Sequence, residues 1–368
     1  MNFTYNALPT RVIFGSGTLS ELPAEVDRLG IARALILTTS HQGVGAQRIA
    51  QLLSARTAGV FGGAVMHTPV EVTDDAIALA NELRIDGLVA IGGGSTTGLS
   101  KAIALRTDLP QVVVPTTYAG SEMTPIIGET SNGKKVTQSS PRVLPETVLY
   151  DVDLTMTLPT KLSGTSGINA IAHAVEALYA KDRNPVVSLM ALAAIKLLAK
   201  SLPLIAENPL HGEARADALQ GAWLSGICLG SVGMALHHKL CHTLGGTFNL
   251  PHAETHAVIL PHALAYNAAA VPDVMSSLGE ALGTNNVPLF FYELAGRIGA
   301  DRSLHSLGMD ESGVSVAVDE AFANPYWNPR PLERMEIEAL LCRAFNGESP
   351  LAGKTVTNKD LSHGHAKG

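Results

Sequence analysis

The chain has 368 residues, of which 46% are hydrophobic and 16% are charged, and its formal net charge at pH 7 is −7. This length corresponds to about two domains, and the composition is that of a globular protein and excludes a disordered chain. The negative charge argues against a nucleic-acid partner, because phosphate binding needs a basic surface.

Three features of the sequence indicate the cellular compartment of the protein. The first 17 residues contain no apolar segment behind a basic stretch, so we expect no signal peptide. Apolar runs such as LVAIGGG are shorter than the roughly 20 residues that span a bilayer, so we expect no membrane association. The three cysteines include no C-x-x-C pair, which is typical of reduced thiols in a cytoplasmic protein.

Short β-rich runs alternate with helical patterns in the first part of the chain. The predicted strands are 34–38, 60–66, 88–91 and 111–114. The predicted helices between them are 44–55, 74–83 with Thr73 as its N-cap, and a third that follows the glycines at 92–94 and continues to Ile103. This alternation predicts an α/β domain with a parallel, doubly wound sheet.

The second part of the chain is rich in alanine and leucine and has few strand signals. Its predicted helices are 168–180, 185–202, 214–229 and 237–244. The change of pattern lies near Asp151 to Lys161. We therefore predict an α/β domain at 1–155, an all-helical domain at 156–353 and a mobile polar tail at 354–368.

A glycine-rich turn joins the strand at 88–91 to the helix that follows it. Its residues Gly92, Gly93, Gly94, Ser95 and Thr96 place free backbone N–H groups and a positive dipole end at the start of a helix. Glycine also allows an anion to approach closely. These features predict a pyrophosphate site, and the alternative is a tight turn without a ligand.

A second loop, at 115–122, follows the next strand at the same edge of the sheet. Thr116 and Thr117 contribute hydroxyl groups there. Ligands of such sheets bind at the carboxyl ends of the strands, so two such loops at one edge favour a dinucleotide site.

Histidines are concentrated in one short segment of the second half. Six of the 13 lie between positions 237 and 262: His237, His238, His242, His252, His256 and His262. His238 and His242 are four residues apart and so share a helix face, as do Asn169 and His173. The cluster could be a divalent metal site of His173, His238 and His252, a metal-free set of donors around an anionic substrate, or core histidines. We expect His256 and His262 to be structural.

Five motifs together resemble the iron-containing (group III) alcohol dehydrogenase family. They are RVIFGSG at 11–17, GGGSTTGLSK at 92–101, PTTYAGSEMT at 115–124, SGINAIAHAVE at 166–176, and the segment 237–252. The resemblance covers nearly the whole chain apart from the tail. It implies a dehydroquinate synthase-like fold, an NADH or NADPH cofactor and a homodimer, with Lys135 as a further cofactor contact.

Three departures from the family pattern are informative. Metal-dependent members carry an aspartate at the position of Asn169, while His173, His238 and His252 match the other three ligands. An asparagine is a poorer ligand for a hard cation, so the resemblance implies that no metal is required. Many members also have an aspartate at the position of Thr39, which would repel a 2′-phosphate, and we therefore predict that both NADH and NADPH are accepted. The third departure is Gly98, where the family often has an aspartate.

The variant motifs resemble a branch that reduces the carbon–carbon double bond of a small dicarboxylate enone during the degradation of aromatic compounds. His242 is the predicted proton donor, and His173, His238 and His252 are the predicted donors to the enolate oxygen. The predicted partners of the substrate are Tyr118, Asn169, His237, Lys239 and Arg142. Two alternatives are a metal-dependent alcohol or polyol dehydrogenase and a non-catalytic nucleotide-binding protein.

Overall fold

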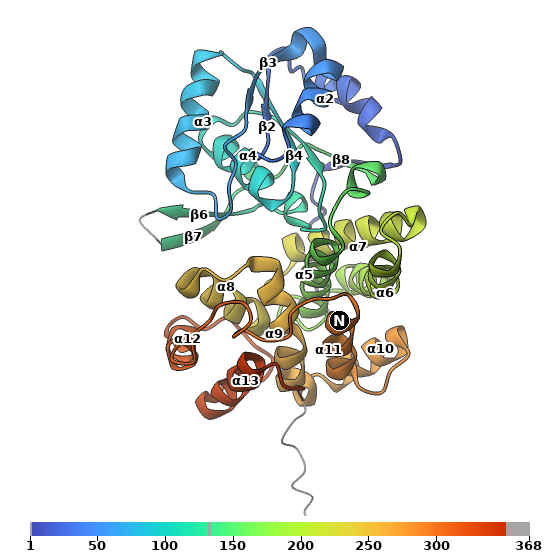
Figure 1. The fold of residues 1–368 in the computed structure, drawn as a ribbon, viewed down its shortest axis with the longest axis vertical. Helices are drawn as coiled ribbons and strands as arrows, with labels where there is room; N and C mark the ends of the chain where they lie inside the picture. Colours follow the sequence, from blue (N-terminus) through green and yellow to red (C-terminus); the bar gives the residue numbers. More distant parts are fainter. Residues whose placement is uncertain (1, 132–133, 351–368) are drawn as a thin grey trace, which may run out of the picture.

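The computed structural model describes residues 2–131 and 134–350, so the predicted tail at 354–368 lies outside the described residues. Figure 1 shows two halves stacked along the long axis, an α/β half in blue to cyan and a helical half in green to red. This arrangement confirms the predicted fold class, an α/β part followed by an all-helical part.

The α/β half is built on one parallel sheet of six strands. In spatial order the strands are β1 (Arg11–Gly15), β8 (Thr147–Asp151), β5 (Gln111–Pro115), β4 (Gly87–Gly92), β2 (Ala34–Leu37) and β3 (Thr57–Phe61). From β2 the chain moves outward to β3, and from β4 it moves the other way to β5. The strand order therefore reverses between β2 and β4, and ligands bind at such a point in sheets of this kind.

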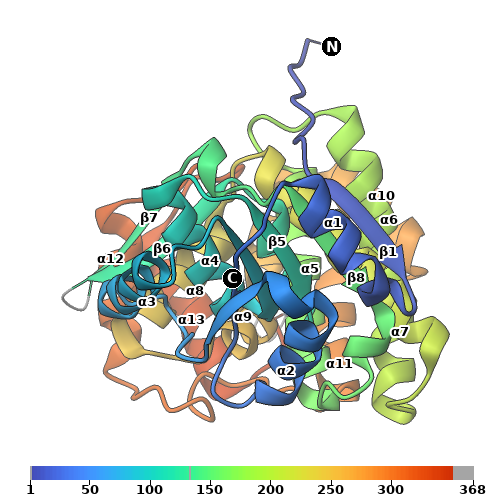
Figure 2. The same ribbon diagram turned by 90° about the horizontal axis from the view of Figure 1, so that it is seen from above.

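Helices cover both faces of the sheet, as Figure 2 shows from above. Leu88 and Ala90 of β4 pack with α3 (Val70–Glu82) and α4 (Gly94–Thr107), while Val89 and Ile91 pack with α1 (Leu22–Arg28) and α2 (Gly43–Leu53). Consecutive strand residues point to opposite faces, so a continuous apolar strand can supply both cores.

Two local predictions were wrong, and several elements were missed, among them the strands β1 and β8 and the helix α1. Helix α3 begins three residues before Thr73, whose hydroxyl donates to the carbonyl of Pro69 (3.3 Å) inside the first turn, so Thr73 is not the N-cap. The strand predicted at 60–66 lies at 57–61. An antiparallel hairpin of β6 (Ile126–Ser131) and β7 (Lys134–Ser139) was missed, because its strands are polar and partly exposed.

The helical half forms two layers with separate cores. Its helices are α5 (Thr160–Leu178), α6 (Pro185–Glu207), α7 (Gly212–Ser231), α8 (Leu236–Phe248), α9 (His252–Asn267), α10 (Pro272–Leu282), α11 (Val287–Arg297), α12 (Gly313–Ala323) and α13 (Arg334–Asn346). One core lies among α5, α6 and α7 and continues to α10 and α11. The other joins α8 and α9 to α12 and α13.

Helix α6 differs from the expectation that all apolar runs are short. It has 23 residues with a mean hydropathy of 1.8 in its most apolar window, which is enough by length and composition to cross a membrane. Helices α7 and α8 would meet the same criterion only as one bent span. A buried core helix also meets it, and α6 packs along α5 and α7 through Val187, Ala191 and Leu198.

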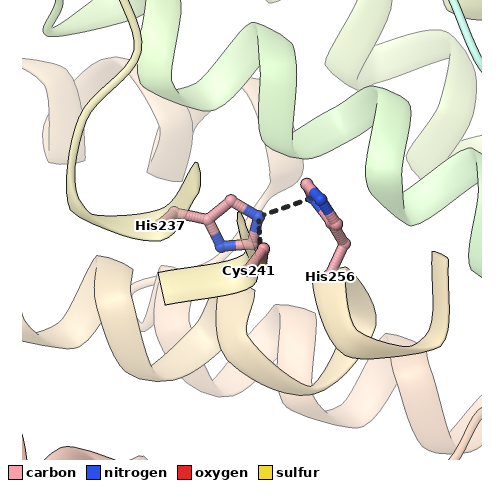
Figure 3. Close-up of side chains that lie close together, drawn as sticks. All are labelled: His237, Cys241 and His256. Carbon is pink, nitrogen blue, oxygen red and sulfur yellow. Dashed lines mark hydrogen bonds between the residues drawn. The ribbon is translucent and has the colours of Figure 1, made fainter. Parts of the chain in front are cut away.

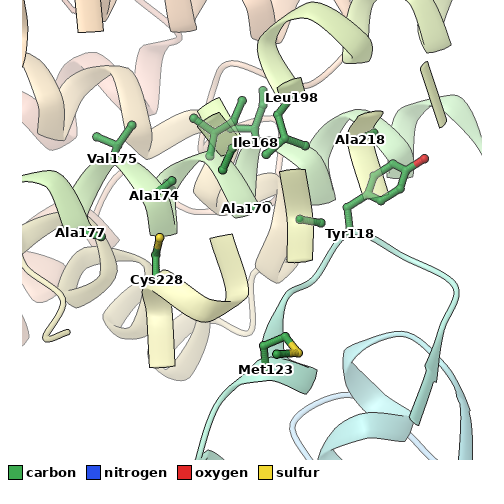
Figure 4. Close-up of a cluster of buried hydrophobic side chains, with 14 of the residues drawn as sticks. Tyr118, Met123, Ile168, Ala170, Ala174, Val175, Ala177, Leu198, Ala218 and Cys228 are labelled. Carbon is green, nitrogen blue, oxygen red and sulfur yellow. The ribbon is translucent and has the colours of Figure 1, made fainter. Parts of the chain in front are cut away.

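The two halves meet where the loop after β5 packs on α7. Tyr118 and Met123 of this loop are buried in the core that α5, α6 and α7 form (Figure 4). Gly120 has a φ of +79°, and its carbonyl oxygen would lie 2.4 Å from a Cβ atom built at Gly226 of α7. A side chain at Gly226 would therefore push the loop away from the helix.

Candidate active site

The glycine turn lies at the carboxyl edge of the sheet, between β4 and α4. Gly92 has a φ of +147°, and a Cβ atom there would meet the hydroxyl of Thr96 at 2.2 Å, so only glycine fits. Gly93 occupies the N-cap position of α4, and no described side chain caps the helix there. A Cβ atom at Gly94 would point into open space. The first N–H groups of α4 are thus placed to bind a phosphate, with the partly exposed Ser95 beside them.

A chain of polar side chains crosses this edge at the point where the strand order reverses. Thr39 follows β2 and donates its hydroxyl hydrogen to Oε1 of Gln42 (3.2 Å), and Nε2 of Gln42 donates to the hydroxyl of Thr116 (3.1 Å) after β5. Thr117 lies beside the turn, 2.9 Å from where a Cβ atom of Gly93 would be. The structure therefore brings Thr39, Thr116 and Thr117 to the glycine turn. It adds Gln42, which the sequence analysis missed.

The predicted catalytic histidines converge from three helices. The rings of His173 on α5 and His238 on α8 are stacked with centroids 5.1 Å apart, and the ring of His242 is 6.0 Å from that of His238. His252 begins α9, and its ring lies 4.4 Å from that of His256. Burial, assisted by the neighbouring His238, His252 and His242, lowers the pKa of His173 well below the usual value, so this ring is neutral at neutral pH.

Three buried polar atoms of Asn169, His173 and His238 have no hydrogen-bond partner among the described residues. They are Oδ1 of Asn169, Nδ1 of His173 and Nε2 of His238. Buried polar atoms are almost always hydrogen-bonded in native proteins. The three atoms therefore mark a place where a ligand would supply the missing partners.

Glu176 of α5 fixes the geometry of His238. Its carboxylate accepts hydrogen bonds from the backbone N–H groups of Ala235 (2.7 Å) and His237 (2.8 Å) and lies 2.7 Å from Nδ1 of His238. An ionised carboxylate only accepts, so the hydrogen of this bond belongs to Nδ1 of His238. Glu176 thereby secures the start of α8 and the orientation of the imidazole. The sequence analysis gave it no role, although it lies one turn after His173.

A deeper cluster joins His237, His256 and Cys241 (Figure 3). Nε2 of His237 lies 2.9 Å from Nδ1 of His256, the Cys241 sulfur lies 3.6 Å from the same Nε2, and all three side chains are buried. Ligands around a tetrahedral zinc ion at about 2.1 Å keep roughly 3.4 Å between neighbours, so 2.9 Å indicates a hydrogen-bonded pair. The predicted role of His237 at a substrate carboxylate is not supported, because its ring lies in this packed interior.

The histidines that the sequence analysis named as possible metal ligands do not form a compact ligand group. Within residues 2–131 and 134–350, only the His237, Cys241 and His256 group has ligand atoms that all lie within 4.8 Å of one another. His173, His238 and His252 do not form such a group, and their neighbour Asn169 supplies no charge. Imidazoles are ligands for iron and zinc, and among the described residues no carboxylate joins these histidines in such a group.

The remaining residues that were predicted to contact the substrate or the cofactor lie far apart in the molecule. Tyr118 is fully buried, and Nη1 of Arg215 donates to its hydroxyl (3.3 Å). Arg142 pairs with Asp108 (3.6 Å) beyond the far end of α4, at the opposite edge of the sheet, so its predicted substrate contact is not supported. Lys135 belongs to β7, and its side chain lies outside the described part of the chain.

Two side chains lie near His242: Lys239, and Tyr326, which the sequence analysis did not predict. The hydroxyl of Tyr326 lies 3.0 Å from Nδ1 of His242, and the Lys239 ammonium is 5.8 Å from the centre of the Tyr326 ring. Burial raises the pKa of Tyr326, and the charge of Glu176 adds to the shift, so the phenol keeps its proton. Tyr326 is 84 positions from His242 in the chain, and no sequence spacing could have linked them.

Comparison with known proteins identifies the family of this chain. The sequence model of the iron-containing alcohol dehydrogenase family matches residues 9–152, and the sequence model of the C-terminal part of the same family matches residues 163–345. The chain belongs to the iron-containing alcohol dehydrogenase family. This confirms the resemblance seen in the motifs, and the chain is therefore an NAD(P)H-dependent oxidoreductase.

Individual members of this family are similar over their whole length. The chain is 52% identical to a maleylacetate reductase of a Rhizobium species and 53% identical to one of Sphingobium indicum, each match covering 95% of this chain and 99% of the relative. The crystal structure of maleylacetate reductase from Agrobacterium tumefaciens superimposes with a TM-score of 0.92 at 50% identity, over 95% of this chain and all of that one.

Proposed function

We propose that this chain is a maleylacetate reductase, which uses NADH or NADPH to reduce the carbon–carbon double bond of maleylacetate and gives 3-oxoadipate. The observation that carries the proposal is the group of buried polar atoms of Asn169, His173 and His238 that have no hydrogen-bond partner among the described residues. This chain is about half identical to maleylacetate reductases over nearly its whole length, and this identity supports maleylacetate as its substrate. The reaction would serve the degradation of aromatic compounds.

The proposed chemistry assigns one task to each group of side chains. Gly92, Gly93 and Gly94 would hold the pyrophosphate of NAD(P)H, which would supply a hydride for the alkene carbon β to the ketone. Negative charge then develops on the ketone oxygen, and His173, His238 and His252 are the proposed partners of that oxygen. Because the Nδ1 hydrogen of His238 is given to Glu176, His238 can donate to this oxygen from Nε2 only in its imidazolium form. His242 gives a proton to the carbon next to the ketone, which completes the saturated product.

The two substrate carboxylates need cationic or N–H partners. Lys239 remains the proposed cation, since it lies on the same helix as His238 and His242 and is partly buried. Burial lowers its pKa, although the charge of Glu320 opposes the shift. The Asn169 amide is the proposed neutral partner.

Removal of metals is expected to leave the activity intact. After dialysis against a strong chelator, maleylacetate reduction should proceed at the original rate in a sample shown to be metal-free by elemental analysis. The physical reason is that this site lacks the carboxylate that would help hold a hard cation. Loss of activity that iron or zinc restores, together with oxidation of small alcohols, would instead support a metal-dependent alcohol dehydrogenase.

Both nicotinamide cofactors are expected to support the reaction. Thr39 presents no negative charge at the end of β2, so the 2′-phosphate of NADPH meets no repulsion there. Steady-state kinetics should give values of kcat/KM for NADH and NADPH that differ by less than about a hundredfold, which corresponds to nearly 3 kcal/mol. Thr39→Asp should shift the preference towards NADH, and an unchanged ratio in this variant would argue against the role of Thr39.

We further propose that the enzyme is a cytoplasmic homodimer that acts on a small molecule without a nucleic-acid or membrane partner. The proposed domain limits remain 1–155 and 156–353. Light scattering during size-exclusion chromatography measures the oligomeric state directly, and a mass of about 38.5 kDa, that of one chain, would contradict the dimer.

A further inference from the structure

Gln42 joins two strand ends at the point where the strand order of the sheet reverses. It directly precedes α2, and its side chain makes no capping hydrogen bond to that helix. Instead, Oε1 accepts a hydrogen bond from the Thr39 hydroxyl after β2 (3.2 Å), and Nε2 donates to the Thr116 hydroxyl after β5 (3.1 Å). The Gln42 side chain therefore belongs to the carboxyl edge of the sheet and not to α2.

The backbone around Gln42 holds the carboxamide at this edge. The Gln42 N–H donates to the carbonyl of Thr39 (3.1 Å), and the Gln42 carbonyl accepts from the N–H of Ala46 (3.2 Å). Oε1 also lies 2.6 Å from where a Cβ atom of Gly92 would be, so a side chain at position 92 would displace it. The carboxamide is thus held against the glycine turn, and it is only partly exposed.

Both partners of this carboxamide are hydroxyl groups, and a hydroxyl can either donate or accept a hydrogen bond. If the carboxamide turned by 180°, Nε2 would donate to the Thr39 oxygen, and the Thr116 hydroxyl would donate to Oε1. Neither hydrogen bond would be lost, so both orientations satisfy the same three residues. A carboxylate or a backbone group at either end would instead have fixed one orientation.

The orientation of the carboxamide decides what Thr39 offers to a ligand. When Oε1 faces Thr39, the hydroxyl hydrogen is used, and the oxygen offers only lone pairs. When Nε2 faces Thr39, the oxygen accepts from Gln42, and the hydrogen is free for an acceptor. The residue at the end of the second strand meets the adenosine ribose in dinucleotide-binding sheets, where NADH has a 2′-hydroxyl that can donate and NADPH has a 2′-phosphate that accepts.

We propose that Gln42 is a positioning residue that lets one site accept both cofactors, because its carboxamide turns over and reverses the Thr39 hydroxyl. With NADH, Oε1 faces Thr39, and the ribose 2′-hydroxyl donates to the Thr39 oxygen. With NADPH, Nε2 faces Thr39, and the Thr39 hydroxyl donates to the 2′-phosphate. The inference rests on the proposed function, in which NADH and NADPH both support the reaction.

Magnetic resonance tests the reversal without any substrate. In deuterated protein with protonated threonine methyl groups, the Gln42 side-chain NH₂ signals are assigned by their loss in Gln42→Met. The methyl signals are assigned in the same way with Thr39→Val and Thr116→Val. The NH₂ protons should show their stronger nuclear Overhauser effect to the Thr116 methyl group with NADH bound and to the Thr39 methyl group with NADPH bound. The same stronger partner in both complexes would overturn the proposal.

Cofactor affinity, measured by fluorescence, tests what the reversal achieves. A carboxylate only accepts, so Gln42→Glu keeps the Thr39 hydrogen directed towards position 42 and away from a 2′-phosphate. NADPH affinity should fall about tenfold or more, while NADH affinity should change less than about threefold. Gln47→Glu is the matched control, because it adds the same charge at an exposed position of α2 and should leave the ratio of the two affinities unchanged. An unchanged ratio in Gln42→Glu would contradict the proposal.

A neutral double variant shows whether Gln42 acts through Thr39. Gln42→Met keeps the length of the side chain but removes both hydrogen bonds, so it should weaken the binding of each cofactor about threefold or more. In the Thr39→Val background the same change should alter either affinity less than about 1.5-fold, since residues that act as a unit are not additive. An equal loss in both backgrounds would mean that Gln42 acts independently of Thr39, which contradicts the proposal.

These measurements also separate the inference from the proposed function, because none of them needs maleylacetate. If NADH and NADPH bind with the two carboxamide orientations but the protein does not reduce maleylacetate, the proposed function fails and the role of Gln42 stands. If maleylacetate is reduced with both cofactors but the carboxamide keeps one orientation, the proposed function stands and the role of Gln42 fails.

Discussion

Replacing His242 by asparagine is expected to slow reduction of maleylacetate by about 10²–10⁴-fold, the range for loss of a general acid. Without a proton donor the enolate persists, and the hydride can return to the cofactor. Asparagine keeps a polar side chain on the same face of α8 but cannot deliver a proton. Single-turnover loss of NADH absorbance, with enzyme in excess, measures this step apart from product release.

A histidine far from the site provides the control for this experiment. His305 is exposed and packs on Phe345 beside the end of α13, so His305→Asn should react like the wild type. NADH affinity should be unchanged in both variants, because His242 is not at the glycine turn. A rate for His242→Asn within about threefold of the wild type would remove His242 from the mechanism.

Replacing Lys101 by methionine is expected to reduce the free energy of unfolding by about 3 kcal/mol or more. Lys101 belongs to α4 and is buried, and its Nζ lies within hydrogen-bond distance of four acceptors, for which it has at most three hydrogens: the carbonyl oxygens of Ser121, Thr124 (2.7 Å) and Ile126 (3.0 Å) and the Thr124 hydroxyl (2.9 Å). Methionine fills the space but leaves these acceptors buried, and each unsatisfied group costs about 1–3 kcal/mol.

The shift in the midpoint of urea unfolding measures this loss. Lys200→Met is the matched control, because Lys200 is exposed and its pair with Asp217 (3.3 Å) should contribute less than about 1 kcal/mol. Lys101 also ties α4 to the loop that follows Thr116 and Thr117, so its loss should weaken NADH binding as well. A midpoint equal to that of the wild type would show that the loop does not depend on Lys101.

Local patterns predicted much of the framework from the sequence. The buried strand that ends at Gly92 and the polar residues after β2 and β5 were recognised because their signals lie within a few neighbouring residues. Parallel strands place all their carboxyl ends at one edge, and this rule correctly brought Thr116 and Thr117 to the glycine turn, while Thr39 was named from the family resemblance. The four-residue spacing of His238 and His242 was likewise enough to put both rings on one face of α8.

The contacts that the sequence could not predict depend on tertiary structure. Arg142 looked like a cation for the substrate, but its place at the far end of α4 depends on how the sheet is assembled. His237 is next to His238 in the chain, yet the turn of the helix directs it into the interior towards His256. Tyr326 reaches His242 from a segment that carries no periodic signal, so its position depends on tertiary contacts that no sequence pattern indicates.

The loop after β5 also bears on how the chain is made. Residues up to 155 leave the ribosome before α7 exists, and an N-terminal part generally folds first during synthesis. Until α7 is complete, Tyr118 and Met123 lack the helix that buries them in the finished protein. The nascent α/β half therefore has an apolar loop exposed to water, and we expect it to need a chaperone or rapid completion of the chain to avoid aggregation.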